Sequence, residues 1–149
     1  MMYAVTSFSQ AHKVKDFVIY EDTSFYAAFP SVIKSEDGEI LVAFRRAPDR
    51  TVFQEKSTNH VDPNSYLVLV RSRDNGLSWS KEPELISAHP FGGSQDPCLL
   101  KLKDGTLLCT SYTWAYIRGD VEDLRQPVFE AIEGVVFLGG YVMRSSDMG

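Results

Sequence analysis

An internal repeat constrains the fold of this chain more than any other feature of its sequence. Residues 30–41 (PSVIKSEDGEIL) and 97–108 (PCLLKLKDGTLL) share proline, lysine, aspartate, glycine and leucine at one offset of 67 residues. Residues 71–76 (RSRDNG) and 144–149 (RSSDMG) are related by an offset of 73. Self-similarity on this scale is typical of stacked or radially arranged supersecondary units. The chain therefore contains two copies of one unit, and the second copy has an insertion.

Each copy has the pattern of antiparallel β-strands. Apolar runs in 30–44 and 97–112 flank an Asp-Gly pair, which supplies the positive φ values of a two-residue type I′ hairpin turn. Residues 65–71 predict a third strand, and a turn at 74–76 leads to a fourth at 79–86. The second copy repeats this pattern at 106–116 and 140–144.

Two further segments are predicted less directly. The insertion at 118–133 is expected to form a short helix or a loop, because Pro127 disfavours a long helix. Residues 14–20 are expected to form one more strand, which would close a ring against a last unit.

Four antiparallel strands make one blade of a β-propeller. We therefore predict an all-β chain of about two blades, with the first at 24–88 and the second at 94–149. A ring of blades cannot be closed by two of them.

Composition narrows the range of partners. The chain has 149 residues and no apolar run near the roughly 18 residues of a membrane span. Its net charge is −5 and it has no basic cluster, so we expect neither a membrane nor a nucleic acid as partner. Residues 1–12 show no secretory signal, which leaves the cytoplasm as the default compartment. The histidines are dispersed and no Cys/His spacing fits zinc, so neither a metal nor a cofactor is predicted.

The turn after the third strand carries a recognisable motif. Its aspartate can accept hydrogen bonds from turn N–H groups, its glycine suits a left-handed backbone, and its tryptophan can pack between strands. The motif resembles the Asp-box (BNR) repeat of the sialidase superfamily, and its residues are Ser72, Asp74, Gly76, Ser78 and Trp79. A second box begins with Ser145, Asp147 and Gly149 and stops there, so we expect a reading frame that ends early. All these residues are predicted to be structural.

The resemblance implies the N-terminal part of a six-bladed β-propeller and an exo-acting glycoside hydrolase with its substrate at the ring centre. Sialidases carry a carboxylate-binding arginine at the start of the first blade, whereas Ala28 stands at the matching position here. The substrate is therefore expected to be a glycan other than a sialoside. The alternative is a non-catalytic Asp-box propeller that binds carbohydrate or protein.

Five residues are candidates for contact with the substrate. Three of them lie in or after the second strand of the first blade, and two lie at the start of the first strand of the second blade. Arg45 and Arg46 alternate faces at a strand end, so one of them should point to the substrate, with Arg46 slightly favoured. His60 is a candidate substrate contact, with a surface histidine as the alternative. Gln95 and Asp96 occupy the positions of Ala28 and Phe29 in the second unit and are candidate substrate contacts, although Asp96 could instead cap the strand start.

Asp62 is the candidate proton donor. It lies ten residues before Ser72, the spacing that the resemblance implies for the acid/base aspartate. That role would require partial desolvation to raise the pKa of the carboxyl group. The alternative is a simple turn before the third strand.

The remaining catalytic groups implied by the resemblance are a tyrosine nucleophile, its glutamate and further arginines, and these come from later blades. The chain alone is therefore predicted to be inactive. Its open sheet edges are expected to promote self-association.

Overall fold

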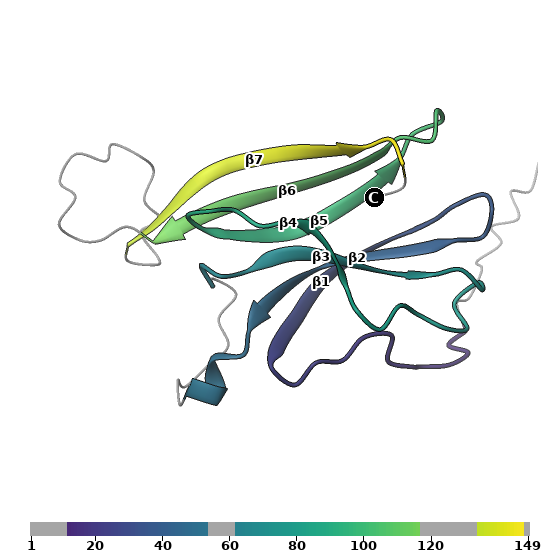
Figure 1. Ribbon diagram of the computed structural model, residues 1–149, viewed down its shortest axis with the longest axis horizontal. Helices are drawn as coiled ribbons and strands as arrows, with labels where there is room; N and C mark the ends of the chain where they lie inside the picture. Colours follow the sequence, from purple (N-terminus) through teal and green to yellow (C-terminus); the bar gives the residue numbers. More distant parts are fainter. Residues whose placement is uncertain (1–11, 54–61, 117–133, 148–149) are drawn as a thin grey trace, which may run out of the picture.

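The computed structural model describes residues 12–53, 62–116 and 134–147, and these form two antiparallel β-sheets. The first sheet has the order β1-β2-β3-β4, and the second has the order β5-β6-β7. A 3-10 helix, η1, follows β2. Figure 1 shows the two sheets as neighbouring layers, and neither closes on itself. The prediction of an all-β chain is confirmed. The bounds are β1 Phe25–Lys34, β2 Ile40–Pro48, η1 Arg50–Phe53, β3 Tyr66–Ser72, β4 Glu84–Ser87, β5 Gly93–Lys101, β6 Leu107–Tyr116 and β7 Val135–Ser145.

Both Asp-Gly turns adopt one conformation, but it is not the predicted type I′ turn. The backbone N–H of Gly38 donates to the carbonyl of Ser35 (3.1 Å), and Gly105 donates to Leu102 in the same way (3.0 Å). Only the glycine of each Asp-Gly pair has a positive φ, 92° at Gly38 and 89° at Gly105. This is the geometry of a type I turn followed by a glycine bulge.

The aspartate side chains explain the difference in turn type. Oδ1 of Asp37 accepts the N–H of Glu39 (3.2 Å), and Oδ1 of Asp104 accepts the N–H of Thr106 (3.0 Å). Each aspartate caps its turn from a right-handed backbone conformation, so only the following glycine has to be left-handed.

The first strand of each sheet also bends at the same place. The register shifts between Ala28 and Ser31 in β1 and between Gln95 and Cys98 in β5, positions that are again 67 residues apart. Inside the two bulges Phe29 has a φ of 56° and Asp96 a φ of 38°. Left-handed values are uncommon for such residues and cost of order 1–3 kcal/mol. The two units therefore share an unusual backbone conformation as well as a sequence pattern.

The central strands β2 and β3 are buried on both faces. One face forms the core between the two sheets, where Leu41, Ala43 and Leu69 meet Leu107. The other face packs against residues outside the sheets, including Tyr20 and Trp79. Its buried members are Val42, Phe44, Val68 and Val70.

Comparing equivalent residues shows that each unit leaves part of one face exposed. Ile33 of β1 and Leu99 of β5 both pack on the core between the sheets. Val32, the equivalent of Leu99, is 64% exposed, and Leu100, the equivalent of Ile33, is 55% exposed. The exposed part of the first sheet's face around Val32, beside the part that Tyr20 and Trp79 cover, and the face of the second sheet that carries Leu100 are called the open faces below.

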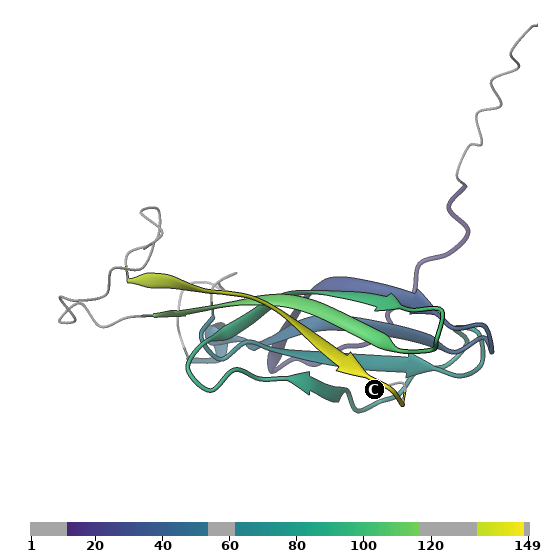
Figure 2. The same ribbon diagram turned by 90° about the horizontal axis from the view of Figure 1, so that it is seen from above.

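Other predictions for the strands need correction or lie outside the described residues. The strand expected at 14–20 is absent, because no described strand pairs with these residues, and residues 14–18 lead away from the sheets (Figure 2). The fourth strand is restricted to Glu84–Ser87. The insertion at 118–133, His60 and Gly149 lie outside the described residues. The described part of the chain contains no helix long and apolar enough to cross a membrane.

Candidate functional site

A buried arginine stands near the end of β2. Arg45 has an exposed fraction of 0%. Leu41 and Ala43 lie on the same face of the strand and belong to the core between the sheets, so Arg45 points toward the second sheet.

Carboxylates and phenols from several strands and loops surround this arginine. Burial lowers the pKa of Arg45, and the nearby charges of Asp62 and Asp96, with the phenols of Tyr26 and Tyr112, act in the opposite direction. The guanidinium carbon lies 5.9 Å from the centroid of the Tyr26 ring. These five residues are called the arginine cluster below.

Asp62 is held as an ion pair. Its carboxylate, 4% exposed, accepts hydrogen bonds from Nε of Arg50 (2.8 Å) and from the second guanidinium nitrogen (3.1 Å). The N–H of Asn64 donates to the same carboxylate (2.8 Å). Burial raises the pKa of Asp62, but these bonds and the charges of Arg50 and Arg45 outweigh that effect and hold the pKa below its usual value. Asp62 thus has the burial expected of a catalytic acid without the raised pKa.

Asp96 and Tyr112 form the part of the cluster that comes from the second sheet. The hydroxyl of Tyr112 donates to Oδ2 of Asp96 (2.8 Å). Burial and this bond to a carboxylate raise the pKa of Tyr112 to about 12. Asp96 itself is exposed and stands on the strained bulge of β5.

Arg46 lies on the opposite face of β2, away from the cluster. It pairs with Asp22 and donates to the hydroxyl of Tyr66 (2.9 Å). Its guanidinium carbon lies 3.6 Å from the centroid of the Phe25 ring, and Tyr20 is also close, at 5.8 Å. Alternation of faces was predicted, but the structure brings Arg45, not the favoured Arg46, together with Asp62 and Asp96.

Close contacts join the two sheets beside the cluster. The N–H of Ser94 donates to the carbonyl of Ser65 (3.0 Å), and the hydroxyl of Ser65 donates to the carbonyl of Ser94 (2.9 Å). A Cβ on Gly93 would lie 2.2 Å from the carbonyl oxygen of Asp62. Gln95 is buried at this junction and pairs with Tyr112 in the sheet. The loop that carries Asp62 is therefore fixed against the start of β5.

The sequence-based prediction missed three residues of the site, Tyr26, Arg50 and Tyr112. Tyr112 could have been found, because it stands 67 residues after Arg45 and is therefore its equivalent in the second unit. Arg50 carries no comparable signal, since its pairing with Asp62 depends on how the chain folds back after β2.

The residues predicted to form an Asp box make a self-contained hydrogen-bonded turn away from the cluster, called the Asp-box turn below. Hydrogen bonds from the hydroxyl and N–H of Ser78 and from the hydroxyl of Ser72 lower the pKa of Asp74 to about 2. The N–H of Gly76 donates to the hydroxyl of Ser72 (2.8 Å), and Trp79 packs on the buried face of β2 and β3. In the second copy the hydroxyl of Ser145 donates to Asp147 (2.6 Å), as in the first.

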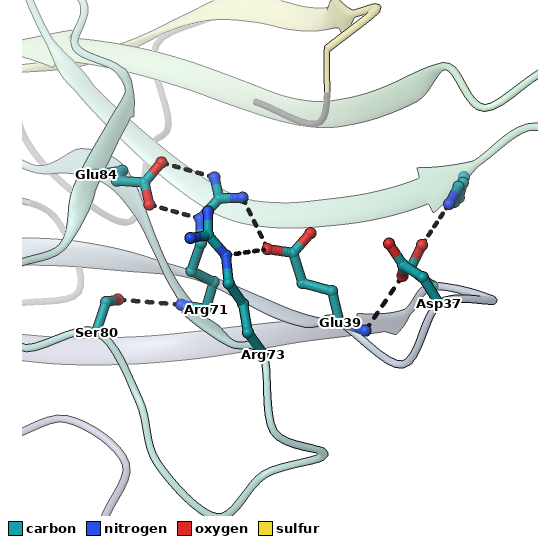
Figure 3. Close-up of polar contacts among 8 residues, drawn as sticks. Asp37, Glu39, Arg71, Arg73, Ser80 and Glu84 are labelled. Carbon is teal, nitrogen blue, oxygen red and sulfur yellow. Dashed lines mark hydrogen bonds and ion pairs between the residues drawn. The ribbon is translucent and has the colours of Figure 1, made fainter.

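A charged network lies at the same end of the strands as the Asp-box turn. The guanidinium of Arg71 forms ion pairs with Glu84 (2.6 Å) and with Glu39 (3.2 Å). Arg73 also pairs with Glu39 (3.3 Å), as Figure 3 shows. The N–H of Arg71 donates to the hydroxyl of Ser80 (3.1 Å). These contacts link the turn before β2 with β3 and β4 and have a structural role.

The arginine cluster is thus the place in the described chain with a buried charge, two carboxylates and two phenols. Such groups can donate to and accept from the hydroxyls of a polar ligand. No group of three potential metal ligands occurs in residues 12–53, 62–116 and 134–147.

Comparison with known proteins gives a clear likeness to a solved structure. A crystal structure of a protein of unknown function from Dyadobacter fermentans DSM 18053 is 66% identical in sequence, with a TM-score of 0.84 over 92% of this chain. The chain spans only 37% of the length of that protein. A family 117 glycoside hydrolase from the marine bacterium Zobellia galactanivorans matches 62% of this chain and 30% of its own at 16% identity, with a TM-score of 0.44, which is too low to carry a conclusion. No family model and no curated protein matches the chain.

Proposed function

We propose that this chain forms about two blades of a sialidase-like β-propeller whose complete ring hydrolyses a glycan. In this proposal the substrate lies at the strand ends where the arginine cluster stands. The repeated bulges and turns support the assignment of two equivalent units. The open faces, and the greater length of the Dyadobacter protein, support further units beside these two.

One observation carries the functional part of the proposal. Arg45 is fully buried at a strand end, with the charges of Asp62 and Asp96 nearby. Removing a charge from water is costly, and a packed apolar side chain often stabilises a fold better than a buried ion pair. Perturbed charged groups that gather at one end of a sheet are therefore candidates for a functional site.

The test is activity of the complete protein that contains this chain. Aryl glycosides, including sialosides, would be screened with the unchanged protein, with Asp62→Asn and with Asp16→Asn, an exposed ion-pair residue far from the cluster. We expect turnover of one glycoside class and a loss of at least tenfold in Asp62→Asn only. Equal turnover by all three proteins would remove Asp62 from the mechanism.

A second candidate function is glycan binding without hydrolysis. The low pKa of Asp62 favours it, because a paired and ionised carboxylate is a poor proton donor. Calorimetric binding of a glycan that the complete protein does not hydrolyse would support this alternative.

A further inference from the structure

We propose that this site takes a neutral sugar rather than sialic acid or another anionic sugar, an inference that rests on the proposed function. This inference follows from the side chains that stand on the bulges of β1 and β5 and from the balance of charges around Arg45.

The two bulges present different side chains at one repeated position. Phe29 occupies it in the first unit and Asp96 in the second, each with a left-handed φ. Phe29 is 37% exposed and Asp96 is also exposed. A sugar ring has apolar C–H faces and polar hydroxyl edges, so an aromatic ring and a carboxylate are complementary to its two kinds of surface. The strained backbone at both positions is consistent with a functional constraint on these side chains.

The charges of the cluster, taken together with Arg50 beside it, are already balanced. Two cations, Arg45 and Arg50, face two carboxylates, Asp62 and Asp96. Arg50 uses two of its nitrogens on Asp62. A ligand carboxylate bound beside the cluster would be repelled by the carboxylates of Asp62 and Asp96. The hydroxyl groups of a neutral sugar could donate to and accept from these residues without such repulsion.

The start of β1 contributes no further charge. Ala28 pairs with Arg45 across the sheet, and its methyl side chain carries no charge. A guanidinium that could balance a ligand carboxylate is therefore missing from this part of the described chain.

The experiment compares sugars and one substitution in the complete protein. Neutral aryl hexosides would be set against an aryl sialoside and an aryl glucuronide, with binding measured by calorimetry and turnover by release of the aryl group. Asp96→Asn is the informative variant, because asparagine tolerates positive φ and keeps the size of the side chain. Asp16→Asn is the control for loss of one negative charge.

We expect a neutral hexoside to be preferred by at least tenfold. We also expect Asp96→Asn to weaken its binding at least tenfold and to reduce the discrimination against anionic sugars, with an unchanged thermal midpoint. A preference for the sialoside or the glucuronide would overturn this inference and leave the proposed function standing. An unchanged affinity in Asp96→Asn would equally overturn it, and absence of any sugar binding would remove both proposals.

Discussion

At the scale of single residues, Arg45 and Arg46 show how one step along a strand changes the surroundings of a charge. Arg46 keeps partial access to water and is enclosed by Phe25, Tyr20 and Tyr66, where cation–π contacts stabilise it. Arg45 is fully buried and depends on carboxylates from other segments. Loss of the buried Asp62 carboxylate should therefore affect stability as well as activity.

Substitution Asp62→Asn should destabilise the complete protein by about 3 kcal/mol at neutral pH, the order expected when one member of a buried ion pair is removed. Arg50 would lose its counter-charge and Arg45 its largest compensating one. Urea denaturation followed by tryptophan fluorescence would measure the change. Asp16→Asn, which breaks an exposed pair with Lys13, should leave the midpoint nearly unchanged. Equal midpoints for all three proteins would contradict the ion-pair assignment.

The Asp74 carboxylate should make the stability of the protein depend on pH in acid. Its folded pKa of about 2 lies below the 3.8 of an unfolded aspartate. Stability from this group is therefore complete above 3.8 and is lost as the pH falls from 3.8 toward about 2. The difference in unfolding free energy between the unchanged protein and Asp74→Asn should shrink over this window. Denaturant titrations at a series of pH values would measure it, and a constant difference would show that the Asp74 bonds do not stabilise the fold.

At the scale of elements, the repeat predicted most of the strands, because each Asp-Gly pair lies between apolar runs. It could not predict the turn type, since that depends on whether Asp37 and Asp104 cap the turn with their own side chains. The expected strand at 14–20 was wrong because a strand needs a partner, and periodicity in one segment does not reveal whether a partner is present.

For the site, the resemblance selected Asp62, the place at a strand end selected Arg45 and Arg46, and the repeat selected Asp96; the structure brings Asp62, Arg45 and Asp96 together. The sequence could not select between Arg45 and Arg46, because the choice depends on which face of β2 meets the second sheet. That information lies in the packing of two units against each other and not within either one.

Close approach of β5 to the Asp62 loop makes a prediction about two strand glycines. Gly93→Ala should lower the free energy of unfolding by about 2–3 kcal/mol. The added Cβ would lie 2.2 Å from the carbonyl oxygen of Asp62, which cannot move without disturbing the junction between the sheets. Gly140→Ala is the matched control, since its Cβ would meet its nearest neighbour, the carbonyl oxygen of Ser111, at an ordinary 3.6 Å. Thermal unfolding of both variants would measure the difference. Similar midpoints would show that the two sheets do not meet as closely as described.

At the scale of the whole molecule, the two open faces are complementary in a way that follows from the repeat. The core between the sheets forms where the Ile33 face of the first unit meets the Leu99 face of the second. Leu100 of the second unit is the equivalent of Ile33, and Val32 of the first unit is the equivalent of Leu99. Both Leu100 and Val32 are exposed. The contact between the units could therefore be repeated between the second unit of one copy and the first unit of another. Such a contact is heterologous, so it would produce head-to-tail assemblies or a closed ring.

Residues 1–149 expressed alone should consequently self-associate, with a mass that rises with concentration in multi-angle light scattering. Leu100→Lys should lower that mass, because a charge on the open face of the second sheet would have to be buried in the head-to-tail contact. Leu77→Lys is the matched control, since Leu77 is also exposed but lies in the Asp-box turn and outside both open faces. If association instead used free strand edges, the two lysine variants would behave alike, because neither changes a backbone hydrogen bond. A compact monomer at all concentrations would show that neither the open faces nor the strand edges drive association.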